Sequence, residues 1–424
     1  MKPVRQVVEI AYKDERFIGY LNFDETEKYL EFLVEPLKNR DELLDWDSVK
    51  TFNCTLHNGK VVSCFKCKLA NTQNDNLVRY NIYIYVEDNF KRYDELKFNN
   101  ITAIFPKVNI WFVGKEFKYN SSLEYKGQQI DLSVYEGRSS QFSKHTELSE
   151  KYLIVQLKSN TEMDLELVDE IYFKISAIFS FFIDKYVSYT HYVAIREKVR
   201  TYEIYQRGQN PINDVRLGQM NYWMSKKMTD EEFFNIFVRP LTLPNFDIWF
   251  NYVGILRSKQ LVEEQYLIYA RCLEIISRDN VDTKIYKDTE RRAKGKIYKE
   301  LIEGMDLDEN YKASLIEAFK FSNTKSFKVL LLQLIQNSSF AGQLELLMKG
   351  VKLDKLVGNI VNMRNHLTHG TPYEKIDTES LVFYEELIKQ MVTYFILQEH
   401  GINAPLKIEH LYSNFEKLPE PLIK

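Results

Sequence analysis

The residues with the clearest chemical potential lie near the C-terminal end of the chain, where Arg364, Asn365 and His369 occur within six positions. A histidine takes or gives protons near pH 7, and an arginine offers a planar fork of N–H donors to a phosphate. Cleavage of RNA by its own 2′-hydroxyl needs both functions, because a proton must move and the charge of the phosphorane must be stabilised. Asn365 could orient the imidazole or hydrogen-bond the phosphate. The three residues therefore indicate phosphodiester chemistry.

A helix has to position these residues. From Ala341 to His369 apolar residues recur at helical spacing, and the Gly370-Thr-Pro372 that follows is typical of a helix end. At ~100° per residue, Arg364 falls in the middle of the apolar face. A guanidinium there must be paired, face a cleft or meet a partner subunit, because an isolated buried charge is costly. The structural alternative makes Arg364 a buried structural arginine and His369 a histidine that caps the helix.

A second candidate site is a run of basic residues between positions 284 and 299. The run holds seven lysines and arginines against two acidic residues, Asp288 and Glu290. Because RNA binding requires a cationic surface, we predict that the centre of this run contacts RNA. The alternative is an ordinary solvated helix face. The residues predicted to bind RNA are Arg291, Arg292, Lys294 and Lys296.

Four potential zinc ligands lie close together in the N-terminal part, namely Cys54, His57, Cys64 and Cys67. Asn58-Gly59 lies between two short strands, and this pair predicts a two-residue turn that would place Cys54 opposite Ser63. Side chains alternate along a strand, so Cys54 and Cys67 would share one face while His57 and Cys64 point to the other. We therefore predict ordinary strand cysteines and no metal or other cofactor, with zinc binding as the alternative.

The elements that carry these residues fall into distinct regions. Residues 1–160 contain short runs of aromatic and β-branched residues, which favour a β-sandwich or an open barrel. Residues 161–244 read as a mixed α/β connector that begins with a helix. Residues 245–424 show helical periodicity almost throughout, which predicts a helical bundle. The predicted fold class is therefore an α+β multidomain protein.

Composition narrows the class of protein further. The chain has 424 residues, of which 45% are hydrophobic and 28% charged, and this excludes a largely disordered protein. The net charge of −3 means that any RNA contact must come from a local patch. No apolar run approaches the ~20 residues that a bilayer requires, and the first residues do not resemble a signal peptide. We therefore predict a cytoplasmic protein that does not engage a membrane.

Residues 364–370, Arg-Asn-His-Leu-Thr-His-Gly, resemble the R-N-x3-H active-site motif of the HEPN superfamily. Residues 269–278 resemble the helix that carries an acidic residue in these domains, and the resemblance gives Glu274 a supporting role. A β-rich domain before the bundle is similar to the layout of ApeA-type antiphage HEPN proteins. The strands that begin at Asn58 and Asn109 resemble strands of that N-terminal domain.

The resemblance implies a metal-independent endoribonuclease that forms a homodimer through its HEPN domain and acts in abortive infection against phage. It implies catalytic roles for Arg364, Asn365 and His369, and RNA as the partner, with tRNA as one candidate substrate. The N-terminal domain would then sense a phage-derived trigger or restrain the nuclease. The alternative is a HEPN module that binds RNA or protein without cutting. The predicted division is an ApeA-like N-terminal domain over 1–160, a connector over 161–244 and a HEPN bundle over 245–424.

Overall fold

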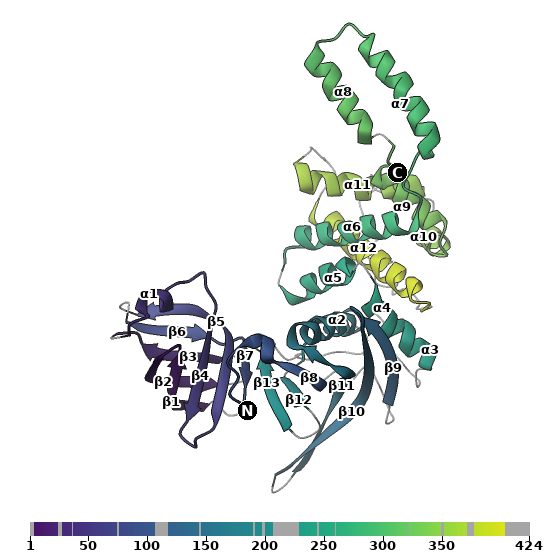
Figure 1. The fold of residues 1–424 in the computed structure, drawn as a ribbon. Coiled ribbons are helices and arrows are strands. Elements are labelled where there is room, and N and C mark those ends of the chain that lie inside the picture. The colour runs from purple at the N-terminus through teal and green to yellow at the C-terminus, as the bar shows by residue number, and fades with distance from the viewer. Residues whose placement is uncertain are drawn as a thin grey trace. The chain divides into compact units, whose positions relative to one another are not determined.

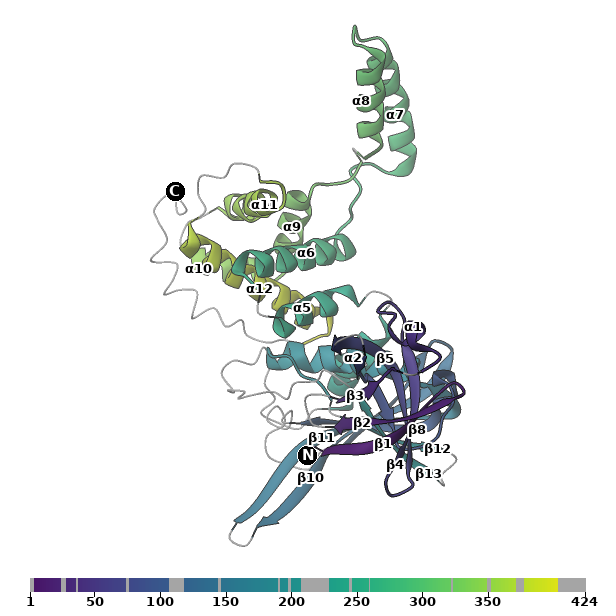
Figure 2. The same ribbon diagram turned by 90° about the vertical axis from the view of Figure 1, so that its left-hand side faces the viewer.

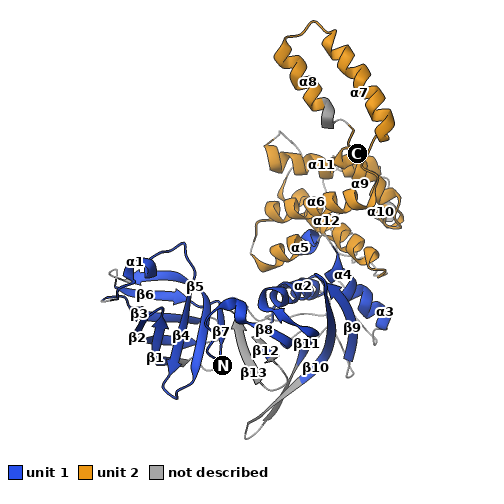
Figure 3. Ribbon diagram, in the orientation of Figure 1, with its two compact units in different colours: residues 1–249 blue, residues 250–424 orange. Residues whose placement is uncertain are grey.

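The chain divides into two compact units, residues 1–249 and residues 250–424 (Figure 3). A computed structural model describes most of both units, and each unit is considered by itself below. The described residues are 4–23, 28–35, 37–73, 76–106, 118–143, 146–189, 191–196, 200–206, 229–243, 246–258, 260–321, 323–348, 352–370 and 377–402.

The first unit begins with six antiparallel strands that close into a barrel (Figure 1). Their order is β4-β1-β2-β3-β6-β5, and β5 pairs with β4 again. Closure pairs both edges of the sheet, so the barrel leaves no edge strand of its own exposed to other chains. The strands are β1 (Val4–Tyr12), β2 (Glu15–Phe23), β3 (Lys28–Leu33), β4 (Lys50–Leu56), β5 (Val61–Gln73) and β6 (Leu77–Asn81), and a short helix α1 (Arg40–Leu43) follows β3.

Aromatic side chains fill the barrel because alternate residues of each strand point inward. The rings of Phe52 and Tyr80 meet edge to face with their centroids 5.0 Å apart, and Phe32 packs against both. The Tyr80 hydroxyl donates a hydrogen bond to the backbone carbonyl of Leu43, which ties α1 to the barrel. Only one side of each barrel strand faces the core, and this explains why apolar residues alternate along these strands in the sequence.

The hairpin between β4 and β5 differs from the prediction. Cys54 pairs with Val62 rather than Ser63, and the amide of Leu56 donates to the carbonyl of Lys60 at 2.8 Å. The loop therefore has three residues, and its last residue, Gly59, has a φ of 79°. A three-residue loop that ends in a left-handed glycine is a common alternative to the two-residue turn. The predicted register was wrong by one residue, and such a shift moves side chains to the opposite face.

A second antiparallel sheet continues from the barrel, because β5 pairs with β7 as well as with β4 and β6. Its order is β7-β13-β12-β8-β11-β10-β9. The strands are β7 (Ile84–Val86), β8 (Lys97–Pro106), β9 (Lys118–Tyr125), β10 (Gln128–Ser143), β11 (Thr146–Asp164), β12 (His191–Arg196) and β13 (Arg200–Gln206), with a 3-10 turn η1 (Tyr93–Glu95) between β7 and β8.

Helix α2 (Leu165–Ile183) packs on this second sheet, as its long apolar face requires. The buried Tyr172 hydroxyl lies 2.9 Å from the Ile101 carbonyl on β8 and 3.0 Å from the Val155 carbonyl on β11. The unit ends in helical turns that begin at Asp230. These are α3 (Asp230–Phe233), a π-helical turn η4 (Phe234–Val238) and α4 (Arg239–Thr242).

The second unit is helical, and the division between the units falls inside its first helix. Helix α6 lies at its centre and contacts α9, α11 and α12 (Figures 1 and 2). None of the described helices is long and apolar enough to cross a membrane. The helices are α5 (Asp247–Arg257), α6 (Val262–Asn280), α7 (Asp288–Glu303), α8 (Glu309–Phe321), α9 (Phe327–Gln336), α10 (Phe340–Met348), α11 (Leu353–His369) and α12 (Thr378–Glu399).

The prediction of a β-rich N-terminal region followed by a helical region is confirmed, and the fold is an α+β multidomain one. The single helix expected from Ala341 to His369 was wrong, because α10 ends at Met348 and α11 begins at Leu353, with Lys352 in extended conformation as its N-cap. The strand expected near Asn109 lies outside the described residues. The predicted boundaries at 160 and 244 stay predictions, although strands β12 and β13 beyond residue 160 pair with β8 and β7.

Candidate active site

Helix α11 carries the motif residues, and its apolar face fixes it against the bundle. Leu356, Ile360 and Met363 are buried along this face. Polar contacts also hold the helix in place: the Tyr266 hydroxyl of α6 donates to the Ile360 carbonyl at 2.8 Å. The Asn359 amide of α11 donates to the Tyr384 hydroxyl of α12 at 2.9 Å. The helix is therefore anchored on two sides, one turn before Arg364.

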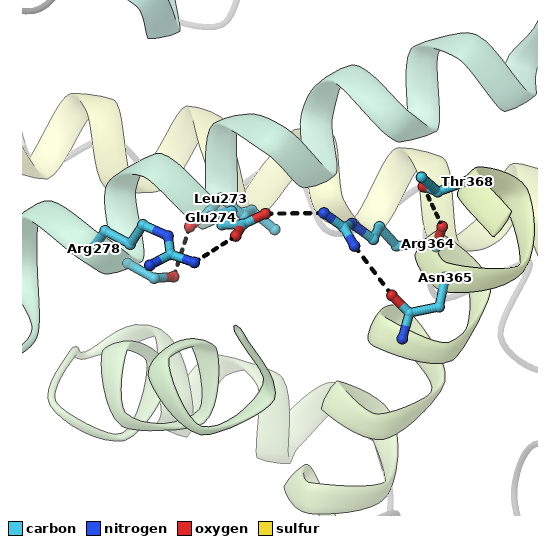
Figure 4. A network of polar contacts seen from close by, with 7 residues as sticks. Leu273, Glu274, Arg278, Arg364, Asn365 and Thr368 are labelled. Atoms are coloured by element: carbon cyan, nitrogen blue, oxygen red, sulfur yellow. Dashed lines mark hydrogen bonds and ion pairs between the residues drawn. The ribbon is translucent and has the colours of Figure 1, made fainter. Parts of the chain in front are cut away.

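The Arg364 side chain lies between two oxygen acceptors (Figure 4). Its Nη2 is 3.3 Å from Glu274 Oε2 on α6, and its Nη1 is 3.2 Å from Oδ1 of the neighbouring Asn365. The side chain is half-buried, at 32% exposure. The guanidinium is thus paired, as its position on an apolar helix face required. Among the described residues these contacts use two of the five N–H donors of the guanidinium.

Glu274 holds a second arginine, which the sequence analysis did not identify. Its other oxygen, Oε1, lies 2.8 Å from Nη2 of Arg278, one turn further along α6. One carboxylate therefore joins two guanidinium groups from two helices (Figure 4). The spacing of Glu274 and Arg278, four residues apart on a helix, was the signal that could have revealed this pair. The three charged groups together carry one net positive charge.

His369 is the last residue of α11 and is exposed. The next residue, Gly370, ends the helix in the left-handed conformation with a φ of 66°, and its amide donates to the His366 carbonyl at 2.8 Å. Arg364 and His369 are five residues apart, which separates them by about 140° around the helix and about 7.5 Å along it. Among the contacts of the described residues, none joins the imidazole to Arg364 or Asn365. The structure therefore brings together Arg364, Asn365 and Glu274, and leaves His369 at the adjacent helix end.

The residues predicted to bind RNA all lie on α7, but they do not share one face. The Lys294 amine lies 3.3 Å from Oε1 of Glu290 and 3.9 Å from the centre of the Tyr286 ring. Arg292 and Lys296 are exposed, about 40° apart around the helix and well over 100° away from Lys294. Arg291 is exposed as well. The assignment of these residues to RNA stays a prediction.

The cysteine cluster has a different geometry from the one predicted. Cys54, Cys64 and Cys67 are all buried in the barrel core, whereas His57 is exposed at the turn. Contact with the Cys54 thiol and burial both raise the pKa of Cys64, and burial raises the pKa of Cys67. Among the described residues there is no group of three or more His, Cys, Asp or Glu side chains suited to holding a metal ion.

Comparison with known proteins gave two matches to family models. The model described as ApeA N-terminal domain 1 matches residues 10–203, and the model described as Apea-like HEPN matches residues 267–406. The first match covers most of the barrel and of the second sheet, and the second covers all of α11 and most of α6, which carry Arg364 and Glu274. No curated protein and no solved structure matched the chain.

Proposed function

We propose that this chain, in which an ApeA N-terminal domain 1 precedes an Apea-like HEPN domain, is a HEPN-type endoribonuclease that acts in defence against phage. The observation that carries the proposal is the Arg364 guanidinium. It is held between Glu274 and Asn365 at the end of α11, with the exposed His369 at the same helix end. A fixed arginine and an accessible histidine are the two groups that cleavage by the 2′-hydroxyl requires.

In the proposed reaction the 2′-hydroxyl of RNA attacks the adjacent phosphorus, and the bond to the 5′-oxygen of the next nucleotide breaks. The products are a 2′,3′-cyclic phosphate and a 5′-hydroxyl. His369 takes the proton of the attacking hydroxyl or gives one to the leaving oxygen. Arg364 donates hydrogen bonds to the non-bridging oxygens, whose negative charge grows in the transition state. These groups require no metal ion, and we propose that the enzyme is metal-independent.

We further propose that two copies pair through their HEPN domains. In one copy Arg364 and His369 point to different sides of α11, since they are about 140° apart around the helix. A two-fold axis near the end of α11 would bring the His369 of one copy towards the Arg364 of the other. The substrate would then be RNA bound across both helix ends, with tRNA as one candidate. The N-terminal unit would respond to a phage-derived trigger or restrain cleavage.

The test is incubation of the purified protein with total RNA in EDTA. We expect cleavage to continue and to leave cyclic phosphate and 5′-hydroxyl ends, which end-specific labelling detects.

His369→Ala should abolish cleavage with little change in melting temperature, because the side chain is exposed at a helix end. His366→Ala is the matched control, because it removes a histidine from the same helix turn and should retain cleavage. Arg364→Ala should also abolish cleavage, with some loss of stability because Glu274 loses a partner.

Two outcomes would contradict the proposal. Loss of cleavage in EDTA that a divalent cation restores would refute the metal-independent mechanism. Equal behaviour of wild type and His369→Ala, with RNA bound but intact, would favour a HEPN module that binds without cutting. The Arg364–Glu274 ion pair is the observation that keeps this second candidate open, because a paired guanidinium is also a common structural feature.

A further inference from the structure

Helices α7 and α8 form an antiparallel hairpin that stands apart from the other helices of the second unit (Figures 1 and 2). We refer to residues 288–321 as the arm. Its base is tied by backbone hydrogen bonds: the Ile285 amide donates to the Asn323 carbonyl at 2.9 Å, and the Lys325 amide donates to the Thr283 carbonyl at 2.8 Å. Beyond this base, α7 and α8 pack mainly on each other.

The arm buries too little apolar surface to account for its own stability. Only Ile302 is buried among the sixteen residues of α7, and no residue is buried in the part of α8 whose side chains the structure describes. Helices of 16 and 13 residues are marginal in water without tertiary packing. Two helices alone also lack the second layer that a hydrophobic core needs. The arm therefore requires a partner.

Exposed apolar side chains indicate where that partner would bind. Ile297 and Leu301 lie one turn apart on α7 and are 55% and 56% exposed. Met305 in the connecting turn and Tyr311 at the start of α8 are exposed to a similar degree. These four exposed apolar residues lie between the middle of α7 and the start of α8, and we refer to them as the apolar surface of the arm. Water or a polyanion would leave this surface without apolar contacts, whereas a second protein surface would bury it.

The charges of the arm are separated along its length. Residues 287–296, at the base, carry five basic and two acidic side chains, a net charge of +3. Residues 303–309, at the tip, carry Glu303, Asp306, Asp308 and Glu309 and no base, a net charge of −4. Such a tip would repel RNA. The base of one arm, however, is complementary to the tip of another arm that runs in the opposite direction.

We propose that the arm pairs antiparallel with the arm of a second copy of this chain. The two hairpins then form a four-helix bundle in which Ile297, near the middle of α7, lies at the centre beside its counterpart. Leu301, Met305 and Tyr311, nearer the tip, then pack against the aliphatic stems of the lysines and arginines at the partner's base. The basic base of each arm lies beside the acidic tip of the other, and the contact is related by a two-fold axis. In this pairing the lysines and arginines of α7 contact a second protein chain instead of RNA. The proposal does not depend on the proposed ribonuclease activity.

Cross-linking of the full-length protein tests the pairing. The native cysteines are buried, so an engineered surface cysteine reacts selectively with a short bismaleimide. Thr289→Cys places a thiol at the base and Asn310→Cys places one at the tip, both at exposed positions. Antiparallel pairing predicts covalent dimers when the two variants are mixed. Little product should form from either variant alone, since like positions are then about 25 Å apart.

Charge reversal supplies the matched control. Arg292→Glu with Lys296→Glu changes the net charge of the base from +3 to −1. Glu303→Lys, Asp306→Lys and Glu309→Lys together change that of the tip from −4 to +2 and leave the Asp308 cap of α8 in place. When the cysteine pair is built into either background, cross-linking should fall about tenfold or more, because like charges then face each other. A mixture of a base-reversed copy with a tip-reversed copy restores complementary contacts, and cross-linking between them should recover.

The proposal is overturned if the mixed cysteine variants give no dimer, or if homotypic and mixed pairs cross-link equally. Cross-linking that persists in both reversed backgrounds also overturns it, as does cross-linking that nuclease treatment removes. Loss of RNA binding on base reversal, without any cross-linking in the mixture, would identify RNA as the occupant instead.

Discussion

Glu274 pairs with two arginines, Arg364 of the motif and Arg278, and its proposed role is to position the Arg364 side chain. Its carboxylate accepts from Arg364 on α11 and from Arg278 on its own helix, so the fork of Arg364 has a defined direction. A lysine in place of Arg364 would keep the charge but lose the planar fork. The direction of the Arg364 side chain, on which its proposed catalytic role rests, therefore depends on a residue 90 positions away in the sequence.

Replacing Glu274 by glutamine tests this role. We expect kcat for RNA cleavage to fall about tenfold, equivalent to ~1.4 kcal/mol, because the guanidinium loses its fixed orientation. KM should stay equal or fall, because a negative charge near the bound phosphates disappears. The loss of stability should be about 1 kcal/mol or less, since both partners are partly exposed.

Asp354→Asn is the control for that substitution. Asp354 is on α11, the helix of Arg364, and pairs with Lys328 at 3.0 Å, but it lies at the opposite end of the helix from the motif. Its loss should leave kcat and KM unchanged. A fall in kcat that is equal in both variants would show that Glu274 acts through helix stability and not through Arg364.

At the scale of elements, the end of α11 decides where His369 lies. Gly370 stops the helix in the left-handed conformation, and a Cβ added there would meet no atom within 4 Å. Gly370→Ala should therefore cost about 1 kcal/mol through backbone conformation alone. We expect a lower melting temperature and slower cleavage, because the last turn of α11 would fray.

Gly358→Ala is the opposite case on the same helix. Gly358 has ordinary helical conformation, and an added Cβ would have only the Lys328 side chain nearby, at 3.7 Å. This substitution should stabilise the protein by ~0.5–1 kcal/mol and leave cleavage unchanged. Thermal unfolding of the two variants measures the contrast, and two shifts of the same sign would contradict the role of Gly370.

The burial of the cysteines leads to a prediction about the reactivity of their thiols. Contact with the Cys54 thiol and burial raise the pKa of Cys64, burial raises that of Cys67, and in α6 burial raises the pKa of Cys272 to about 12. A raised pKa lowers the thiolate fraction at pH 8, and the thiolate is the reactive form. Native protein at pH 8 should therefore not react with a disulfide reagent such as dithionitrobenzoate, whereas unfolded protein should show four thiols. One fast-reacting thiol in the native protein would contradict the burial described here.

At the scale of the whole molecule, the two units differ in kind. The first is built from antiparallel strands that pair over long sequence separations, and the second from helices. The proposed roles follow this division, with cleavage in the helical unit and sensing or restraint in the strand-rich unit.

A fragment of residues 245–424 tests both the predicted boundary and the proposed restraint. It keeps all of α5, which begins at Asp247, whereas a cut at the division between the units would remove its first turn. We expect circular dichroism typical of helices and a cooperative thermal transition. If the N-terminal unit restrains the nuclease, the fragment should cleave RNA faster than the whole chain. A fragment that is unfolded would show that the HEPN bundle needs residues before 245.

The sequence by itself determined the features that depend on local spacing. The C-terminal end of the helix that carries Arg364 and His369, at Gly370, follows from the positions of glycine and proline, and the strand-rich and helical regions follow from periodicity. The start of that helix did not follow, since one longer helix was predicted. Helical hydrogen bonds join residues four apart, so their pattern is visible in a short window. The motif and its likeness to HEPN proteins depend on seven consecutive residues.

Only the tertiary structure decided which residues meet across elements. The pairing of Arg364 with Glu274, the gathering of three cysteines inside the barrel and the closure of β5 onto β4 join segments that are distant or differently registered in sequence. The hairpin between β4 and β5 shows most clearly what the sequence left open. Asn58-Gly59 suits both a two-residue and a three-residue loop, and the burial of Cys54, Cys64 and Cys67 together selects the register in which they share a face. The free energy that separates the two registers comes from packing in the barrel core, which no local pattern contains.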